Sequence, residues 1–294
     1  MPATRVLLSC VFLSLTAIGG SGAKAAEPAA VAPQYVAVGS SYAAGPGITP
    51  IVAGSPPRCA RSTHNYAHVL AELRGLSLVD ATCSSATTAD VIRGGQFDLP
   101  PQLDAVTSET QLVTVTIGGN DVFFMANLIA MTCASDSSAP QVSRGCTVRP
   151  DALVEDRFAS LADSLRQVVS GARHRSPNAR VVFVNYFTVL PGQGTCARVA
   201  LTAQQADHMR GVAARLADIT RQVARESAAD LVDVAALSRD HNACSNVPWL
   251  TGAHPDPAEL IPPFHPNQNG MRAVGEALNM YLRDHPDPNQ HARF

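Results

Sequence analysis

The sequence predicts an α/β fold in which a parallel sheet is covered by helices on both faces. Short apolar or β-branched segments alternate with longer segments of helical periodicity, and no internal repeat interrupts that order. Residues 111–117, QLVTVTI, form a β-branched run suited to a strand that is buried on both faces. Polar clusters follow the ends of the predicted strands, which is where parallel sheets bind their ligands.

The first half of the chain supplies three strands and two helices. QYVAV (34–38) is a short apolar run that stops at a glycine, as expected of a first strand. Residues 63–75 have helical apolar spacing and end at a glycine, a residue that terminates helices well. LSLVDAT (76–82) is predicted as the second strand and 111–117 as the third. Residues 122–131 then continue as an apolar helix.

The second half supplies two strands and three helices. A long amphipathic helix is expected over 151–177, with Asp151 as its N-cap. ARVVFVNY (179–186) is the fourth predicted strand, and residues 202–228 form the next helix. ADLVDVAAL (229–237) is the fifth predicted strand. A closing helix is expected over 267–285.

The start of the chain is typical of a secretory signal. Arg5 precedes a short apolar run, and Ala23-Lys24-Ala25 supplies a small-x-small cleavage site. Because that run is short for a membrane span, we expect no transmembrane segment after cleavage. The protein is expected to be secreted, free or associated with the cell envelope. We divide the chain into a signal at 1–26, a loose leader at 27–33, one globular domain at 34–284 and a disordered tail at 285–294.

Composition excludes several classes of partner. The formal net charge is -2, and charged residues make up 16% of the 294 residues. The chain therefore has no basic excess that would indicate a nucleic-acid partner, and it carries no acidic tail. Hydrophobic residues make up 46%, enough to bury a sizeable core. We expect a monomer with one large domain.

Six cysteines remain after the predicted signal, an even number that is typical of exported proteins with disulfides. Their spacing favours pairs of sequential neighbours, namely Cys59–Cys83, Cys133–Cys146 and Cys196–Cys244. No pair has C-x-x-C spacing, which argues against a zinc site or a redox dithiol. His64 and His68 lie four residues apart, but no third ligand is evident. We therefore predict no metal.

Four polar segments carry the chemistry. They are GSSYAAG at 39–45, CSSATTAD at 83–90, GGND at 118–121 and PPFHPNQNG at 262–270. A serine needs a base to become a nucleophile, and an acyl-transfer intermediate needs hydrogen-bond donors around its oxyanion. Because the carboxyl ends of parallel strands share one edge, a serine, an amide and a histidine from these segments can meet there. Asp121 is expected to support its own loop by hydrogen bonds.

In this order the four segments resemble the sequence blocks of the SGNH, or GDSL-type, hydrolases. The chain is similar to the secreted, three-disulfide esterases and lipases of actinobacteria over essentially its whole predicted mature length. The resemblance implies a three-layer α/β/α, flavodoxin-like fold with a five-stranded parallel sheet. It also implies a serine esterase or lipase that acts on small-molecule or lipid esters and needs no cofactor. The pattern G-x-S-x-G does not occur around Ser41, which disfavours the α/β-hydrolase fold.

The resemblance also assigns roles to individual residues. It makes Ser41 the nucleophile and His265 the general base and acid. Asn120 becomes a side-chain donor to the oxyanion, and the backbone N–H groups of Ser41 and Ser85 complete the oxyanion hole. Ser40 is the alternative nucleophile, but the register against the family favours Ser41.

Three positions depart from the family pattern. Ser40 stands where the family usually has Asp, and Ser85 stands where it usually has Gly. Many relatives place an Asp three residues before the histidine, where this chain has Pro262. We expect the main-chain carbonyl of Pro262 to orient the ring of His265. The alternatives for this role are Asp256 and Glu259.

Two other functions stay open at this stage. A carbohydrate acetyl-esterase is the alternative within the enzymes, although apolar residues in the expected pocket loops favour a longer acyl chain. Because two family positions are changed, a catalytically impaired relative that binds lipid or glycan is the alternative that is not an enzyme. Retention of Ser41, Asn120 and His265 favours an enzyme, since a binding protein needs none of that chemistry.

Overall fold

The computed structural model describes residue 1 and residues 35–135, 146–256, 258 and 260–286. The predicted signal at 1–26 and leader at 27–33 lie outside the described residues, apart from residue 1. Most of the predicted tail at 285–294 lies outside them as well. These three assignments therefore stay predictions.

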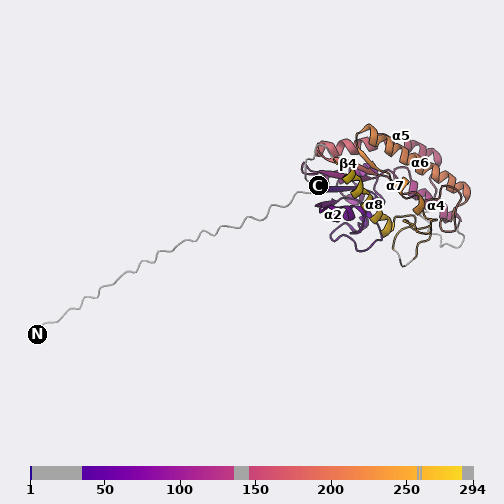
Figure 1. Ribbon diagram of the computed structural model, residues 1–294, viewed down its shortest axis with the longest axis horizontal. Coiled ribbons are helices and arrows are strands. Elements are labelled where there is room, and N and C mark those ends of the chain that lie inside the picture. Colours follow the sequence, from indigo (N-terminus) through magenta and orange to yellow (C-terminus); the bar gives the residue numbers. More distant parts are fainter. Residues whose placement is uncertain (2–34, 136–145, 257, 259, 287–294) are drawn as a thin grey trace. The chain divides into compact units, whose positions relative to one another are not determined.

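Five parallel strands form one sheet in the order β2-β1-β3-β4-β5. Figure 1 shows strands of this sheet, with β4 labelled, among the helices. The order is that of flavodoxin-like folds and confirms the predicted fold class. It reverses beside β1, which pairs with β3 from Tyr35 opposite Leu112 to Gly39 opposite Thr116. The strands are β1 (Tyr35–Gly39), β2 (Leu78–Asp80), β3 (Leu112–Thr116), β4 (Arg180–Val184) and β5 (Asp230–Val232).

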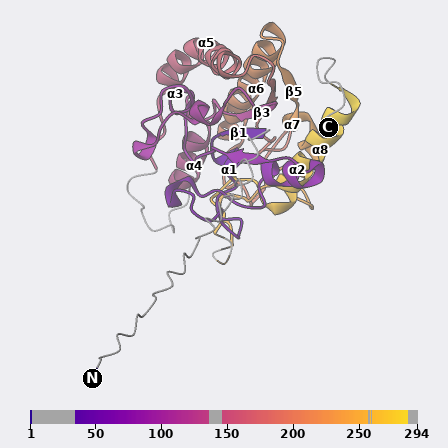
Figure 2. The ribbon, with the colours of Figure 1, turned by 90° about the vertical axis from the view of Figure 1, so that its left-hand side faces the viewer.

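Helices form a layer on each side of this sheet. Helix α2 (Tyr66–Arg74) packs against α8 (Gln268–Asp284), and α5 (Asp151–Arg175) packs against α6 (Ala203–Glu226). Figure 2 shows the α5 and α6 pair on one side of the strands and the α2 and α8 pair on the other. The other helices are α1 (Ser41–Ala44), α3 (Thr88–Ile92), α4 (Phe124–Ser135) and α7 (Val234–Leu237). Four 3-10 turns complete the elements of the described residues: Pro57–Cys59, Gln96–Asp98, Gln102–Ala105 and Arg239–His241.

The last strand is shorter than predicted. β5 ends at Val232, and the following residues form the short helix α7. The carboxylate of Asp233 accepts the N–H of Ala236, as an N-cap does. This cap converts the second half of the apolar run into helix, so the run 229–237 is not one strand.

Two helix starts also differ from the predictions. Asp151 is the first residue of α5 rather than its cap, because Pro150 occupies the N-cap position. A helix that was not predicted, α3, follows the second polar segment. It begins with a capping box in which Thr87 and Asp90 each bond to the other's backbone. The pattern T-x-x-D was therefore a signal in the sequence.

All three predicted disulfides are present: Cys59–Cys83, Cys133–Cys146 and Cys196–Cys244. The first ties the segment after β2 to the turn Pro57–Cys59. The third joins two loops 48 residues apart in the sequence. Across the described part of the chain, no helix combines the length and apolarity that a membrane crossing requires.

Candidate active site

Ser41 begins a four-residue helix immediately after β1. The chain turns at Gly39, where φ is 151° and an added Cβ would lie 2.5 Å from the carbonyl oxygen of Thr116. The N–H of Ser40 donates to that same oxygen at 2.9 Å. The helix closes at Gly45 with a φ of 73°. Residues 39–45, the nucleophile turn, thus place Ser41 at the carboxyl end of the sheet, beside the reversal of strand order.

The fold brings Ser41 and His265 together across 224 residues of sequence. The Oγ of Ser41 lies 2.9 Å from Nε2 of His265, and each residue is 7% exposed. Burial lowers the pKa of His265 to about 4, opposed by a hydrogen bond to the carbonyl of Pro263. The ring is therefore neutral at pH 7. With the proton on Nδ1 directed at that carbonyl, Nε2 can accept the proton of Ser41.

The carbonyl that faces the histidine ring belongs to Pro263, not to Pro262 as predicted. Its oxygen lies 2.8 Å from Nδ1 of His265. The Pro262 carbonyl is occupied elsewhere, because it accepts the backbone N–H of His265 at 3.3 Å and the hydroxyl of Thr251 at 2.7 Å. Phe264 has a φ of 58°, which allows this tight turn. Within this turn the Pro262 carbonyl accepts the backbone N–H of His265, so the Pro263 carbonyl is the one that faces the ring.

Two of the three remaining alternatives for these roles, Asp256 and Ser40, fit the geometry less well. Both ring nitrogens of His265 are used by Ser41 and Pro263, and the carboxylate of Asp256 accepts the N–H of Ala258. Glu259 lies outside the described residues. Ser40 is fully buried, and its Oγ lies 3.1 Å from the hydroxyl of Tyr186 rather than beside the histidine. The geometry therefore favours Ser41 as the nucleophile.

Asn120 follows β3 in residues 118–121, which we call the oxyanion loop. Its Nδ2 donates to the carbonyl of Ala86 at 2.9 Å, which fixes the amide and leaves its second N–H for another acceptor. Asp121 accepts the backbone N–H of Thr88 at 3.1 Å and its hydroxyl at 2.5 Å. The predicted supporting role of Asp121 is confirmed: it ties the oxyanion loop to α3.

Ser85 has a left-handed backbone, with a φ of 70°, and it is exposed. Glycine adopts this conformation at low cost, whereas a Cβ makes it sterically unfavourable for other residues. This backbone explains why glycine is the usual residue at this position in the family that the sequence resembles. The serine keeps the backbone N–H, so the position retains a donor.

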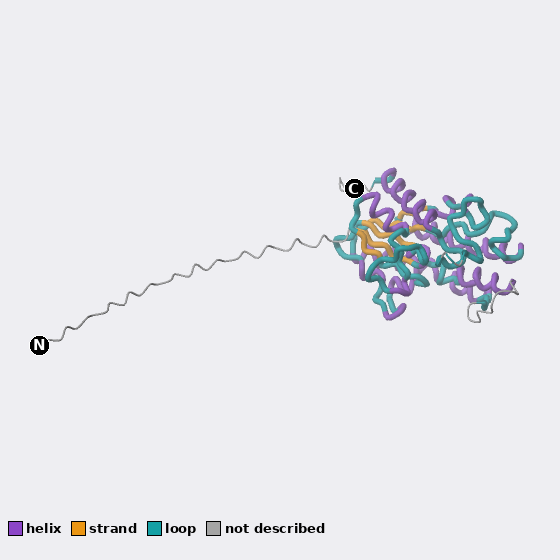
Figure 3. The backbone as a smooth tube through the Cα atoms, turned by 90° about the horizontal axis from the view of Figure 1, so that it is seen from below, coloured by secondary structure: helices purple, strands orange, loops and turns teal. Residues whose placement is uncertain are grey.

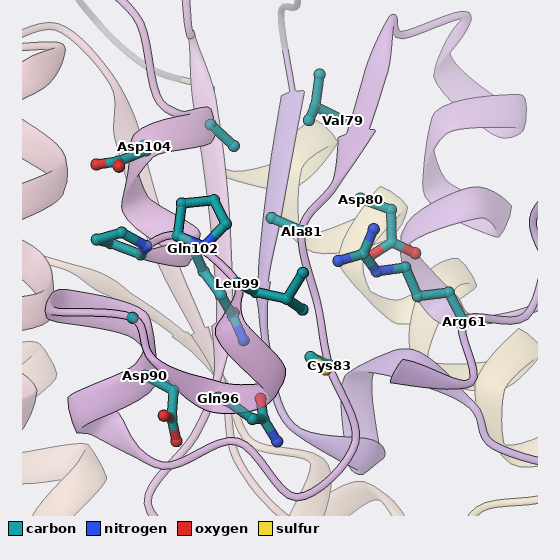
Figure 4. Close-up of a pocket in the computed structure, with 14 residues that line it drawn as sticks. Arg61, Val79, Asp80, Ala81, Cys83, Asp90, Gln96, Leu99, Gln102 and Asp104 are labelled. Carbon is teal, nitrogen blue, oxygen red and sulfur yellow. The ribbon is translucent and has the colours of Figure 1, made fainter. Parts of the chain in front are cut away.

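Sequence reasoning missed the buried polar residues that hold these segments. The side chain of Gln102 accepts the N–H of Gly39 at 2.7 Å and donates to its carbonyl at 3.1 Å. Gln102 also lines a cavity of about 360 Å³ beside β2 and the segment that follows it, which neither Ser41 nor His265 lines (Figure 4). No local pattern marks Gln102, because its partner is 63 residues away.

The segment before His265 is held in the same manner. The hydroxyl of Thr251 donates to Pro262 and accepts the N–H of His265 at 3.1 Å. The hydroxyl of Tyr42 donates to the carbonyl of Phe264 at 2.5 Å and so links the nucleophile turn to the histidine. A large group of loops lies beyond one end of the strands (Figure 3).

Comparisons with known proteins agree with this geometry. A family model described as GDSL-like lipase/acylhydrolase matches residues 37–273. "Lipase 2" of Streptomyces coelicolor is 34% identical over 293 residues, which cover 94% of this chain and 96% of that protein.

Two crystal structures are similar over most of the chain. The extracellular lipase of Streptomyces rimosus matches with a TM-score of 0.66 at 30% identity, covering 84% of this chain and 98% of that one. Phospholipase A1 of Streptomyces albidoflavus matches with a TM-score of 0.67 at 26% identity, covering 85% and 99%. With the Ser41–His265 hydrogen bond, these findings show that the chain is a lipase or esterase and belongs to the GDSL-like lipase/acylhydrolase family.

Proposed function

We propose that the protein is a secreted serine esterase or lipase that cleaves carboxylic esters through an acyl-enzyme on Ser41. The observation that carries the proposal is the 2.9 Å hydrogen bond between Ser41 Oγ and His265 Nε2. A buried, neutral histidine in this position is a base that needs no prior deprotonation at pH 7.

The steps follow from the geometry. His265 takes the proton of Ser41 while Oγ attacks the ester carbonyl carbon. The oxyanion that forms accepts hydrogen bonds from Asn120 Nδ2 and from the backbone N–H groups of Ser41 and Ser85. His265 then protonates the leaving alcohol, which leaves an acyl group on Ser41. A water molecule, deprotonated by His265, releases the acid and restores the serine.

The carbonyl of Pro263 orients the base. It accepts a hydrogen bond from Nδ1–H and so holds one tautomer of His265. The same bond strengthens when the ring becomes imidazolium. The site is thus a Ser-His dyad with a neutral third partner. All of these residues come from one chain, so a monomer is sufficient for activity.

The substrate class is an acyl ester, small or lipid. Of the three relatives described above, two are named as lipases, one of them extracellular, and one as a phospholipase A1, which supports esters of longer acyl chains over acetates. Three disulfides and the signal-like start of the chain support an extracellular location.

The test is hydrolysis of p-nitrophenyl esters from acetate to palmitate by the oxidised protein. We expect Ser41→Ala to abolish turnover and Ser40→Ala to retain it within about threefold, because only Ser41 contacts the base. An optimum at acetate would favour an acetyl-esterase. Full activity of Ser41→Ala, or no hydrolysis of any ester by the wild type, would contradict the proposal.

A further inference from the structure

Tyr186 joins the two loops on which the proposed chemistry depends. It lies just beyond β4, and its hydroxyl is 3.1 Å from Ser40 Oγ and 3.0 Å from the backbone nitrogen of Gly119. Each partner directly precedes a residue of the proposed mechanism, Ser40 before the nucleophile and Gly119 before Asn120. One hydroxyl from the end of β4 therefore contacts the ends of both β1 and β3.

We propose that Tyr186 is a positioning residue that sets the oxyanion loop relative to the nucleophile turn. This inference rests on the proposed function and adds a residue that does not touch the substrate. A shift between the two loops would move Asn120 Nδ2 away from the oxyanion that forms on Ser41. Misplacement by about 1 Å can reduce the rate on the order of 10²-fold.

The protonation state of the phenol suits this role. Burial raises the pKa of Tyr186 to about 12, so the hydroxyl is neutral throughout the working range of an esterase. A neutral hydroxyl has one proton and two lone pairs. It accepts the N–H of Gly119 and is left with its own proton to donate to Ser40 Oγ. Both contacts can therefore exist at once.

The ring of Tyr186 is fixed by packing as well as by its hydroxyl bonds. It packs at 4.8 Å from the ring of Tyr42 and at 6.2 Å, edge-on, from that of Phe124, and Tyr186 is 7% exposed. A Cβ added at Gly119 would lie 2.5 to 2.7 Å from three atoms of the Tyr186 side chain. The glycine is thus required for the oxyanion loop to lie directly on the phenol. A ring held by other aromatic rings gives the hydroxyl a defined position.

Tyr186→Phe removes the hydroxyl and keeps the ring. We expect kcat for p-nitrophenyl butyrate to fall at least about tenfold with KM within about twofold, as for loss of an interaction realised in the transition state. Inhibition by an alkyl trifluoromethyl ketone, which forms an oxyanion on the serine, should weaken by the same factor as kcat/KM falls. A purely structural role would lower the melting temperature without this parallel change.

Tyr35→Phe is the matched control. Tyr35 is fully buried in the sheet, and its hydroxyl bonds to Thr114 Oγ1 at 2.8 Å, away from both loops. We expect it to lower the melting temperature comparably while kcat and the ketone inhibition stay at wild-type values. An equal loss of kcat in Tyr35→Phe, or wild-type kcat in Tyr186→Phe, would overturn the inference.

A second variant covers the case in which Tyr186→Phe does not fold. Ser40→Ala removes one end of the Ser40–Tyr186 bond and leaves the ring untouched. We expect kcat to fall about twofold to threefold and inhibition by the ketone to weaken by a similar factor. Unchanged values of both would overturn the inference. Failure of the proposed function is separately visible, because Ser41→Ala would then match the wild type.

Discussion

The two sides of the site are held by different means. On one side the nucleophile turn, residues 39–45, directly continues a buried strand, and the backbone of Ser40 bonds to the neighbouring strand. On the other side lies the histidine loop, residues 242–266, described except for 257 and 259. Its described residues contain no helix or strand, and side-chain hydroxyls from Thr251 and Tyr42 hold the turn around His265.

This difference teaches where stability and catalysis are coupled. Bonds at the nucleophile turn belong to the sheet, so breaking them should lower the stability of the fold and the rate together. Bonds in the histidine loop position one base in a segment that the sheet does not contain. Breaking them should lower the rate more than the stability. The following variants sharpen or break this contrast.

Of the variants in this comparison, Asn120→Ala should lower kcat most. Loss of one oxyanion donor lowers kcat on the order of 10² to 10³-fold. The measurement is kcat and KM on p-nitrophenyl butyrate. Asn127→Ala is the control, because its amide also bridges backbone groups, those of Arg149, outside the site. Wild-type turnover in Asn120→Ala would exclude Asn120 from the oxyanion hole.

Gln102→Leu should have the next largest effect. The comparison predicts that it lowers both the stability of the fold and kcat. It leaves the buried N–H of Gly39 without its partner, whereas the Gly39 carbonyl still accepts the N–H of Cys83. We expect a cost of roughly 1–3 kcal/mol of unfolding free energy. We expect kcat to fall about tenfold because the turn before Ser41 loosens. Ser176→Ala is the control, since the buried hydroxyl of Ser176 also bonds to backbone, donating to the carbonyl of Thr110 at 2.6 Å, away from the site. The measurements are denaturant unfolding and kcat. Lost stability with an unchanged kcat would show that stability and rate are not coupled at the nucleophile turn.

Thr251→Val tests the histidine side. Valine keeps the shape of threonine but removes the hydroxyl that bonds to Pro262 and to the N–H of His265. We expect kcat to fall about fivefold to tenfold, with a loss of about 1 kcal/mol in unfolding free energy. Thr188→Val removes a similar bond, to Ala235 at 2.6 Å, and should cost stability alone. A stability loss as large as that of Gln102→Leu would erase the contrast between the two sides.

The same contrast decides how much the sequence could predict. Ser41, Asn120 and His265 lie within a residue or two of an element that periodicity marks, so local motifs identify them. The Pro263 carbonyl depends on the backbone angle of Phe264, which no local pattern specifies. The supporting bonds of Gln102 and Tyr186 span 63 to 146 residues, and only the folded chain reveals such pairs.

The pH profile is the finest test of the comparison. The pKa of His265 is lowered to about 4, mainly by burial, so its base form should persist well below pH 6.5. We expect kcat/KM to stay level from pH 7 to about 5 and to fall only as pH approaches 4, where the ring becomes protonated. Because the unfolded chain binds this proton first, stability should fall as pH drops from about 6.5 to 4. His265→Gln should remove that part of the slope. A fall of kcat/KM already near pH 6.5 would mean that water reaches the ring of His265. The histidine loop would then expose its base to solvent, whereas the nucleophile turn continues a buried strand.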